Sequence, residues 1–474
     1  MDNFYFDDID DEPEESSEDR ENLEKEIKEI SERLKDGTAG SISIEALEEI
    51  ISYFFKKQKY GEALPFVNLL TEYIPYSTDG LYRKGAILNH LHRYEEALVC
   101  FEKALKLNPS DLDVILGFGF TLDNLGRYEE ALRCYEKALE INIDCEDTLF
   151  AKAITLEKMN RYQEAIKILK FILEGTPHNK EALYELAFCY DCLDKPADAL
   201  KCYDMHIDLE PFNYNAWYNR GLVLNRMTQY SRAIESYETA LAIKEDFAAA
   251  WYNKGNAFAN IGKLTDAVDC YMRTINIDEK DIPAWHNLGN AYEELGKYND
   301  AIKCFTQAIK NDPKHYESYF GRGSCYGSLE QHQKAFDDYN RALAICGNYP
   351  DLWYARADAA YHLGKWREAI ISYKMTIRMD PYYIEAWFDL GETLLEYGYF
   401  KEALKAFNKC IELHPKWADP YYDKAKVLFL MRKTFDALDS LKTSFRLDPE
   451  KKKEFEREFP GVRSIKEFTS LLEN

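Results

Sequence analysis

The sequence predicts an all-α protein, an α-solenoid of two-helix units stacked one after another. A period of 34 residues runs from residue 44 to residue 451 in twelve copies, without an insertion. Apolar residues within each copy have the spacing of two short helices joined by a polar turn. An alanine recurs once per period: Ala63, Ala97, Ala131, Ala165, Ala199, Ala233, Ala267, Ala301, Ala335, Ala369, Ala403 and Ala437. A fixed period of this length is typical of a solenoid, in which each unit contacts only its neighbours.

One copy, residues 215–246, shows how the pattern specifies a helical hairpin. Trp217 and Leu224 mark the apolar face of its first half, and Ala233 and Tyr237 mark that of its second half. Each half is too short to form a stable helix alone in water. We therefore expect a first helix and a second helix in every copy, with the remaining apolar surface buried by stacking of neighbouring hairpins.

In the first helix of each copy, one fixed position holds a small residue and another holds a large one. A glycine inside a helix costs about 1 kcal/mol relative to alanine, so its recurrence predicts close helix approach. One position is small in eleven copies: Gly85, Gly119, Ala153, Ala187, Gly221, Gly255, Gly289, Gly323, Ala357, Gly391 and Ala425. Another, the Trp position, holds Trp217, Trp251, Trp285, Trp353 and Trp387. At helical spacing from the small residue, these indoles favour core packing over a ligand platform.

Proline ends most copies, because it has no amide hydrogen and clashes with the preceding helical turn. The Pro position holds Pro75, Pro109, Pro177, Pro211, Pro313, Pro381, Pro415 and Pro449, and other residues in four copies. The motif W-x2-[LKR]-G-x2-[YLF], followed by Tyr, Ala, Phe or Tyr, Ala and Pro, resembles the tetratricopeptide repeat (TPR) family. Residues 281–313 carry nearly all of it. The resemblance implies a right-handed superhelix of about twelve repeats, whose first helices line a concave groove.

The two ends differ from the repeats. Residues 1–20 form an acidic tail that we expect to be disordered, because it cannot bury enough apolar surface. Residues 21–43 are predicted to hold an N-terminal capping helix and linker, and residues 44–451 the twelve repeats. Residues 452–474 are predicted to form C-terminal capping helices, the last with a capping box of Ser464 and Glu467.

Composition narrows the class of partner. The net charge is −24, and residues 1–24 contain twelve acidic residues and one basic residue. Nucleic acid and anionic membranes are disfavoured as partners, since both require a basic surface. The sequence contains no apolar run long enough for a membrane span and does not begin like a signal peptide. Eleven scattered cysteines indicate reduced thiols and a cytoplasmic location.

Catalytic and metal-binding patterns are not found. The nine histidines show no metal-ligand spacing. Cys189 and Cys192 form a CxxC inside a predicted helix, which favours packing, with a metal or redox role as the weaker alternative. We therefore expect no enzyme activity, no cofactor and no metal.

The candidate binding surface lies on the first helices. The residues one past the Trp position, here called the groove row, are predicted to face the groove as an apolar wall, or alternatively to pack between adjacent first helices. They are Tyr82, Leu116, Phe150, Tyr184, Tyr218, Tyr252, His286, Phe320, Tyr354, Phe388 and Tyr422. One residue further, Asn219, Asn253 and Asn287 form an asparagine row, with Asn256 and Asn290 one turn on.

The asparagine row resembles the asparagine ladder in the TPR superhelix of O-GlcNAc transferases, which holds a peptide main chain. A carboxamide offers both a donor and an acceptor to a peptide. We expect the three amides to lie in line, free of intramolecular partners. The alternative is that they are repeat consensus without a ligand. The candidate peptide-binding residues are Asn219, Asn253, Asn287, Asn256, Asn290, Tyr218, Tyr252 and His286.

These observations predict a non-enzymatic scaffold that binds proteins or extended peptide segments in its groove. The alternatives are an adaptor or regulatory subunit presenting substrates to a separate enzyme, such as a glycosyltransferase, and a self-assembling structural protein. No glycosyltransferase domain is recognised, so the resemblance implies binding and not transfer. The sequence leaves the oligomeric state open.

Overall fold

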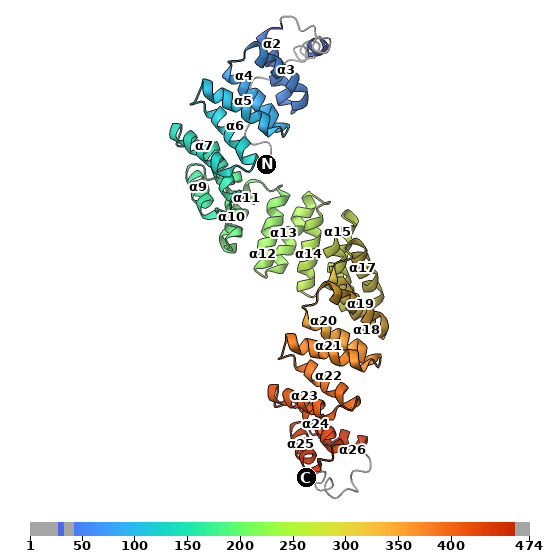
Figure 1. Ribbon diagram of the computed structural model, residues 1–474. Coiled ribbons are helices and arrows are strands. Elements are labelled where there is room, and N and C mark those ends of the chain that lie inside the picture. The colour runs from blue at the N-terminus through green and yellow to red at the C-terminus, as the bar shows by residue number, and fades with distance from the viewer. Residues whose placement is uncertain (1–26, 33–41, 460–474) are drawn as a thin grey trace. The chain divides into compact units, whose positions relative to one another are not determined.

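The computed structural model describes residues 27–32 and 42–459, which form helices joined by short turns (Figure 1). These two ranges contain no β-strand. The chain divides into two compact units, residues 1–229 (unit 1) and residues 230–474 (unit 2). Within each unit, helical hairpins follow one another along the chain, which confirms the predicted all-α solenoid.

Helix bounds follow the 34-residue period. Unit 1 contains residues 27–32 and then α2 (Ile44–Lys56), α3 (Tyr60–Tyr73), α4 (Thr78–His90), α5 (Tyr94–Leu107), α6 (Leu112–Asn124), α7 (Tyr128–Ile141), α8 (Glu146–Lys158), α9 (Tyr162–Gly175), α10 (Lys180–Cys192), α11 (Pro196–Leu209) and α12 (Tyr214–Arg226). Unit 2 contains α13 (Tyr230–Ile243), α14 (Ala248–Asn260), α15 (Leu264–Ile277), α16 (Ile282–Glu294), α17 (Tyr298–Asn311), α18 (Tyr316–Ser328), α19 (His332–Ile345), α20 (Pro350–His362), α21 (Trp366–Met379), α22 (Ile384–Glu396), α23 (Phe400–Leu413), α24 (Asp419–Leu430), α25 (Thr434–Leu447) and α26 (Glu450–Glu458).

The first helices lie on the inner side of each unit. In unit 1, α4 contacts α6, α6 contacts α8 and α8 contacts α10. In unit 2, α14 contacts α16, α16 contacts α18, α18 contacts α20, and α22 contacts α24. Successive second helices make no comparable contacts in the described ranges. Because the stack is closer on the first-helix side, this side is the inner face of each unit.

Close packing explains the recurrent small residues. A Cβ atom added to Gly85 would lie 2.6 Å from the ring of Phe101, and one added to Gly119 would lie 2.7 Å from the ring of Tyr135. Both rings come from the second helix of the same repeat and are at most 1% exposed. The small residues therefore make room for an aromatic side chain of the second helix, and not for the close helix approach that was predicted. The recurrent alanines of the second helices are buried as well, each at most 1% exposed.

The five tryptophans at the Trp position are half-buried, and each indole N–H donates to an equivalent backbone carbonyl. Trp217 Nε1–H donates to the carbonyl of Pro211 at 2.8 Å, and Trp251 Nε1–H donates to that of Glu245 at 2.9 Å. Trp285, Trp353 and Trp387 bond in the same way to Glu279, Gly347 and Pro381. The accepting residue is always at the Pro position. Since a carbonyl is all that the indole requires, residues other than proline can occupy that position.

A left-handed residue follows each first helix, a feature that the sequence analysis did not identify. Its φ lies between 54° and 85° in all twelve copies: Gln58, His92, Gly126, Asn160, Asp194, Thr228, Gly262, Gly296, Glu330, Gly364, Gly398 and Arg432. Gly126 N–H donates to the carbonyl of Asp123, and Arg127 N–H donates to that of Leu122, both at 2.9 Å. This pair of bonds is the Schellman motif that ends a helix.

Glu330→Gly is expected to raise the free energy of unfolding by about 0.5–1 kcal/mol, because glycine adopts a positive φ without a Cβ clash. Glu330 has φ 58° and an exposed side chain. Glu330→Ala is the control, since it removes the same side chain but keeps the Cβ atom. Thermal unfolding followed by circular dichroism measures both, and equal melting temperatures for the two variants would contradict the explanation.

The ends of the described ranges pack against the repeats. Ile30 is 3% exposed and belongs to the same core cluster as α2 and α3. Phe455 of α26 is buried, whereas Phe459 is 36% exposed. The predicted acidic tail and the Ser464–Glu467 capping box lie outside the described residues. The domain boundaries given above therefore stay predictions.

Candidate functional site

The asparagine row lies on the inner face, and its amides are engaged. Asn219 Nδ2 donates to Tyr184 Oη at 2.8 Å, and Asn287 Nδ2 donates to Tyr252 Oη at 3.0 Å. Each tyrosine belongs to the groove row of the preceding repeat. The expectation of free amides is therefore wrong, because stacking places each of these two asparagines beside a phenol 35 residues earlier.

The other predicted asparagines also have partners within the protein. Asn253 Nδ2 donates to the carbonyl of Ala249 at 2.9 Å. Asn256 Oδ1 accepts from Tyr271 Oη at 2.8 Å and from Asn287 Nδ2 at 3.0 Å. Within unit 2, Asn256 and Asn287 thus belong to one hydrogen-bond network, which links two neighbouring repeats.

His286 occupies the groove row between polar and aromatic neighbours. Its Nε2 lies 3.1 Å from Asn290 Nδ2, and its Nδ1 lies 3.2 Å from Ser318 Oγ. Its ring centroid is 5.5 Å from that of Phe305. Burial lowers the pKa of His286 to about 4, so the imidazole is neutral near pH 7. The ring at this groove-row position is therefore uncharged.

The aromatic groove row is half-buried from Tyr82 to Phe388, and Tyr422 is buried. In most repeats the ring packs against the buried aromatic ring of its own second helix, at centroid distances of 5.5–6.2 Å. The pairs are Tyr82–Phe101, Tyr184–Tyr203, Tyr252–Tyr271, His286–Phe305, Phe320–Tyr339, Tyr354–Tyr373 and Phe388–Phe407. The row therefore contributes to the hairpin core and also presents aromatic surface on the inner face. Tyr218 is likewise half-buried.

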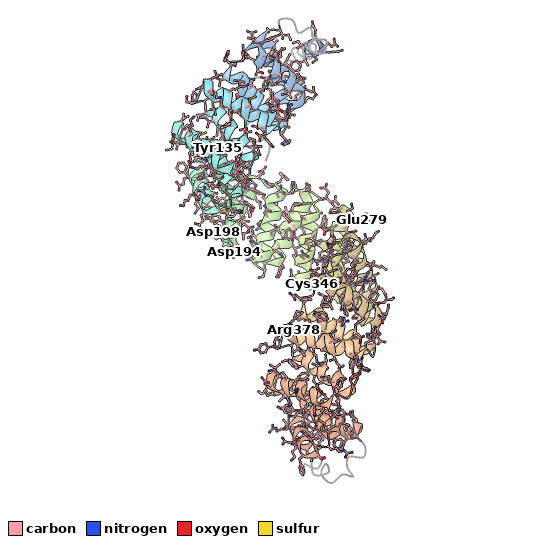
Figure 2. The ribbon with its side chains drawn as sticks, in the orientation of Figure 1. Tyr135, Asp194, Asp198, Glu279, Cys346 and Arg378 are labelled. Atoms are coloured by element: carbon pink, nitrogen blue, oxygen red, sulfur yellow. The ribbon has the colours of Figure 1, made fainter. Side chains whose placement is uncertain are left out.

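Unit 1 contains a groove of about 810 Å³ on this face, here called the unit 1 groove. Tyr135 of α7, labelled in Figure 2, lines it. The other lining residues are Phe120, Asp123, Asn124, Phe150, Ala151, Ile154, Thr155, Lys158, Lys180, Glu181, Tyr184, Glu185, His206, Glu210 and Asn213. A neighbouring hollow of about 370 Å³ shares Ile154, Lys158, Tyr184 and Glu185 with it and extends to Phe188 and Asn219.

Three buried carboxyl groups from three successive first helices lie at or beside the unit 1 groove. Asp123 of α6, Glu157 of α8 and Glu185 of α10 are 5%, 7% and 7% exposed. Asp123 accepts from Thr155 Oγ1 at 2.8 Å and pairs with Lys158. Glu157 accepts from the thiol of Cys189 at 3.2 Å, which agrees with a packing role for this cysteine.

Glu157 and Glu185 are close enough to influence each other's ionisation. Burial is the main cause that raises the pKa of both carboxyls, and for Glu157 the charge of Glu185 raises it further. A hydrogen bond from the Glu157 O–H to the Glu185 carboxylate also raises the pKa of Glu157 and partly offsets the effect of burial on the pKa of Glu185. In the described ranges no cationic side chain lies within ion-pair distance of either group.

Unit 2 carries acidic side chains at matching positions. Asp389 stands where the asparagine row would continue, and its carboxylate accepts from Tyr354 Oη at 2.6 Å. Burial raises the pKa of Asp389 to about 6. The bond from a polar residue to the phenol of the preceding repeat is thus a recurring device, made by Asn219, Asn287 and Asp389.

In the described part of the chain, no group of three or more His, Cys, Asp or Glu side chains is arranged to hold a metal ion. Within the same ranges no helix has both the length and the apolar character needed to cross a membrane.

Family models match several segments of the chain. Tetratricopeptide repeat models match residues 78–111, 282–315, 316–349 and 384–417. A TPR repeat model matches residues 229–262 and 255–296, and a model of the N-terminal TPR repeats region of Psidin matches residues 121–219. Together the matches cover more than half of the sequence. The chain belongs to the tetratricopeptide repeat family.

Solved TPR structures resemble parts of this TPR chain at low identity. YrrB, described as a TPR protein with an unusual peptide-binding site, is 22% identical, covers 38% of this chain and 94% of its own, and has a TM-score of 0.37. A TPR repeat-containing protein from Cytophaga hutchinsonii is 22% identical over 50% of this chain and 97% of its own (TM-score 0.45). The Cut9–Hcn1 hetero-tetramer of APC/C is 15% identical, and the match covers 92% of this chain and 94% of its own (TM-score 0.39). No curated protein matches the chain.

The buried carboxyls are the feature of the TPR inner face that the sequence analysis missed. Glu185 occupies the position of the asparagine row, whereas Glu157 lies six residues further along its own first helix. Because the two glutamates stand at different positions of the repeat, aligning the repeats does not reveal that they are neighbours. The sequence did contain one signal: each glutamate lies on the apolar side of its helix, where a charged residue is unusual.

Proposed function

We propose that this TPR chain is a non-catalytic scaffold that binds proteins or extended peptide segments on the inner, first-helix face of its units. Family membership and the half-exposed aromatic groove row support this function. The observation that carries it is the unit 1 groove, which at about 810 Å³ is large enough to receive side chains and is lined by aromatic and polar groups. The eleven free thiols support a cytoplasmic location for the scaffold.

The hydrogen bonds that the asparagines make within the protein change how a peptide would bind. In Asn219 and Asn287 the amide holds a groove-row tyrosine, so these residues orient the aromatic surface first. Binding of a peptide main chain by the asparagine row then requires exchange of an internal hydrogen bond for one to the peptide. Since such an exchange gives little net free energy, aromatic contact is the larger source of affinity. Tyr218, Tyr252 and His286 contribute surface of this kind in our proposal, beside Asn253, Asn256 and Asn290.

Phe188→Ala is expected to weaken binding of an unstructured peptide by about tenfold or more, since an aromatic contact contributes on the order of 1–3 kcal/mol. Phe188 is 39% exposed beside the unit 1 groove. A displayed library of random peptides supplies the ligand, and fluorescence polarisation measures Kd. Because the side chain is partly exposed, its loss should leave the fold intact.

Phe171→Ala is the matched control. Phe171 is 49% exposed on α9, the second helix of its repeat, and does not line the groove. Its loss should leave Kd unchanged. Failure of the library to yield any binder, or equal weakening by the two variants, would contradict binding at the inner face.

A further inference from the structure

The unit 1 groove has an excess of negative charge with few cations to balance it. Lys158 forms an ion pair with Asp123. Lys180 Nζ lies 3.7 Å from Glu181 Oε1 and 3.6 Å from Glu210 Oε1. Glu157 and Glu185 are left with each other and with the uncharged thiol of Cys189. A groove with this excess of negative charge is complementary to a cationic group.

Glu185 shows where such a group would sit. It is only 7% exposed, and it lines both the unit 1 groove and the neighbouring hollow. Its carboxyl is hydrogen-bonded to that of Glu157, which requires that one of the two keeps its proton. A second negative charge beside the first in a buried place is unfavourable. A cationic group placed against the pair would allow both carboxyls to ionise.

We propose that the unit 1 groove binds an extended peptide segment through a lysine or arginine side chain, whose cationic group sits against Glu157 and Glu185 between α8 and α10. This rests on the proposed function, because it assumes that the inner face holds a peptide. It adds the chemistry of the partner: a segment with a basic residue flanked by apolar ones.

Aromatic side chains complete the site. Tyr184 and Phe188 stand beside Glu185 in the smaller hollow, and Phe150 lines the larger groove. Aromatic surface of this kind packs against the methylene stem of lysine or the plane of a guanidinium, and a ring face attracts the cation itself. Apolar neighbours of the basic residue would contact Phe120 and Ile154.

The ionisation of the pair makes binding depend on pH. The carboxyls are protonated to a greater extent than exposed glutamates, and a cation binds only the ionised form. Affinity for a lysine peptide should therefore rise from pH 6 to pH 8, with release of protons on binding. The titratable and charged groups that face the pair are Asp123 on α6, Lys158 on α8, Tyr162 on α9, Lys180, Glu181, Tyr184, Cys189 and Cys192 on α10, and Tyr203, His206 and Glu210 on α11.

The test compares two terminally blocked peptides on the full chain at physiological ionic strength. One has the sequence Gly-Tyr-Lys-Ala-Leu-Lys-Gly, and its twin has glutamine in place of both lysines. The lysine peptide is expected to bind about tenfold tighter or better, the ratio typical of a hydrogen bond to a charged group. Glu157→Gln/Glu185→Gln should abolish the difference. Glu95→Gln/Glu102→Gln, which removes the same charge from exposed positions on α5, should preserve it.

Each outcome decides the matter. Equal affinity of the two peptides for the unaltered chain, or an unchanged ratio in the Glu157/Glu185 variant, would overturn the basic-residue site and leave the scaffold function standing. Absence of binding by both peptides would overturn both proposals. If the affinity ratio of the two peptides falls equally in the Glu95/Glu102 control variant, the effect is one of net charge only, and the proposed basic-residue site is overturned. Circular dichroism confirms that the variants are folded.

Discussion

Gly289→Ala is expected to destabilise unit 2 by about 1–3 kcal/mol, the usual effect of overpacking a core. A Cβ atom at this place would lie 2.6 Å from Cε1 of Phe305. Phe305 is fully buried, and a Cβ on Gly321, in the next first helix, would also lie 2.6 Å from its ring. Because the ring lies between two glycines, it has no room to move away from a new methyl group.

Gly327→Ala is the control for the same chemical change. Gly327 lies in α18, and a Cβ atom there would have no neighbour within 4 Å. Alanine should therefore stabilise, by up to about 1 kcal/mol, because it is the better helix former. Hydrogen exchange of amides in α16–α18 measures both effects locally, which suits a solenoid that need not unfold in one step. Gly289→Ala as stable as the unaltered chain would contradict this account of the recurrent glycine.

The fold could be predicted because its packing rules repeat. Steric needs such as the small residue beside the Phe305 ring recur every 34 residues, so the sequence displays each of them up to twelve times. The left-handed turn was predictable by the same reasoning, since Gly126, Gly262, Gly296, Gly364 and Gly398 share its position. The non-glycine residues in the other copies hid this signal.

The site was less predictable because its contacts join different positions in neighbouring repeats. The bond from Asn219 to Tyr184 depends on a tyrosine rotamer and on how closely two hairpins stack, neither of which a periodic pattern encodes. The carboxyl pair depends on geometry in the same way. Glu157 and Glu185 are 28 residues apart, which is not the repeat length, and only the stacking of α8 on α10 brings them together.

Glu185→Gln is expected to raise the stability of unit 1 at pH 8 and to change it little at pH 5. Burial raises the pKa of Glu185 above its usual value of 4.5. Above that value the unfolded chain loses the proton first, while the folded chain retains it. The unfolded state then binds fewer protons than the native state, so the free energy of unfolding falls as pH increases. This contribution to stability is present below pH 4.5 and is lost as pH passes the folded pKa.

Glutamine keeps the shape of the protonated carboxyl and cannot ionise, so the variant should not lose this stability. At pH 8 the expected gain is on the order of 1–3 kcal/mol, the cost of ionising a carboxyl that burial holds protonated, and removal of repulsion on Glu157 adds to it. Thermal unfolding and amide exchange of α8 and α10 at both pH values measure the difference, with exposed Glu102→Gln as control. A loss of stability at pH 8 would mean that the Glu185 carboxylate is satisfied within the folded chain, since only a partnered charge stabilises when buried.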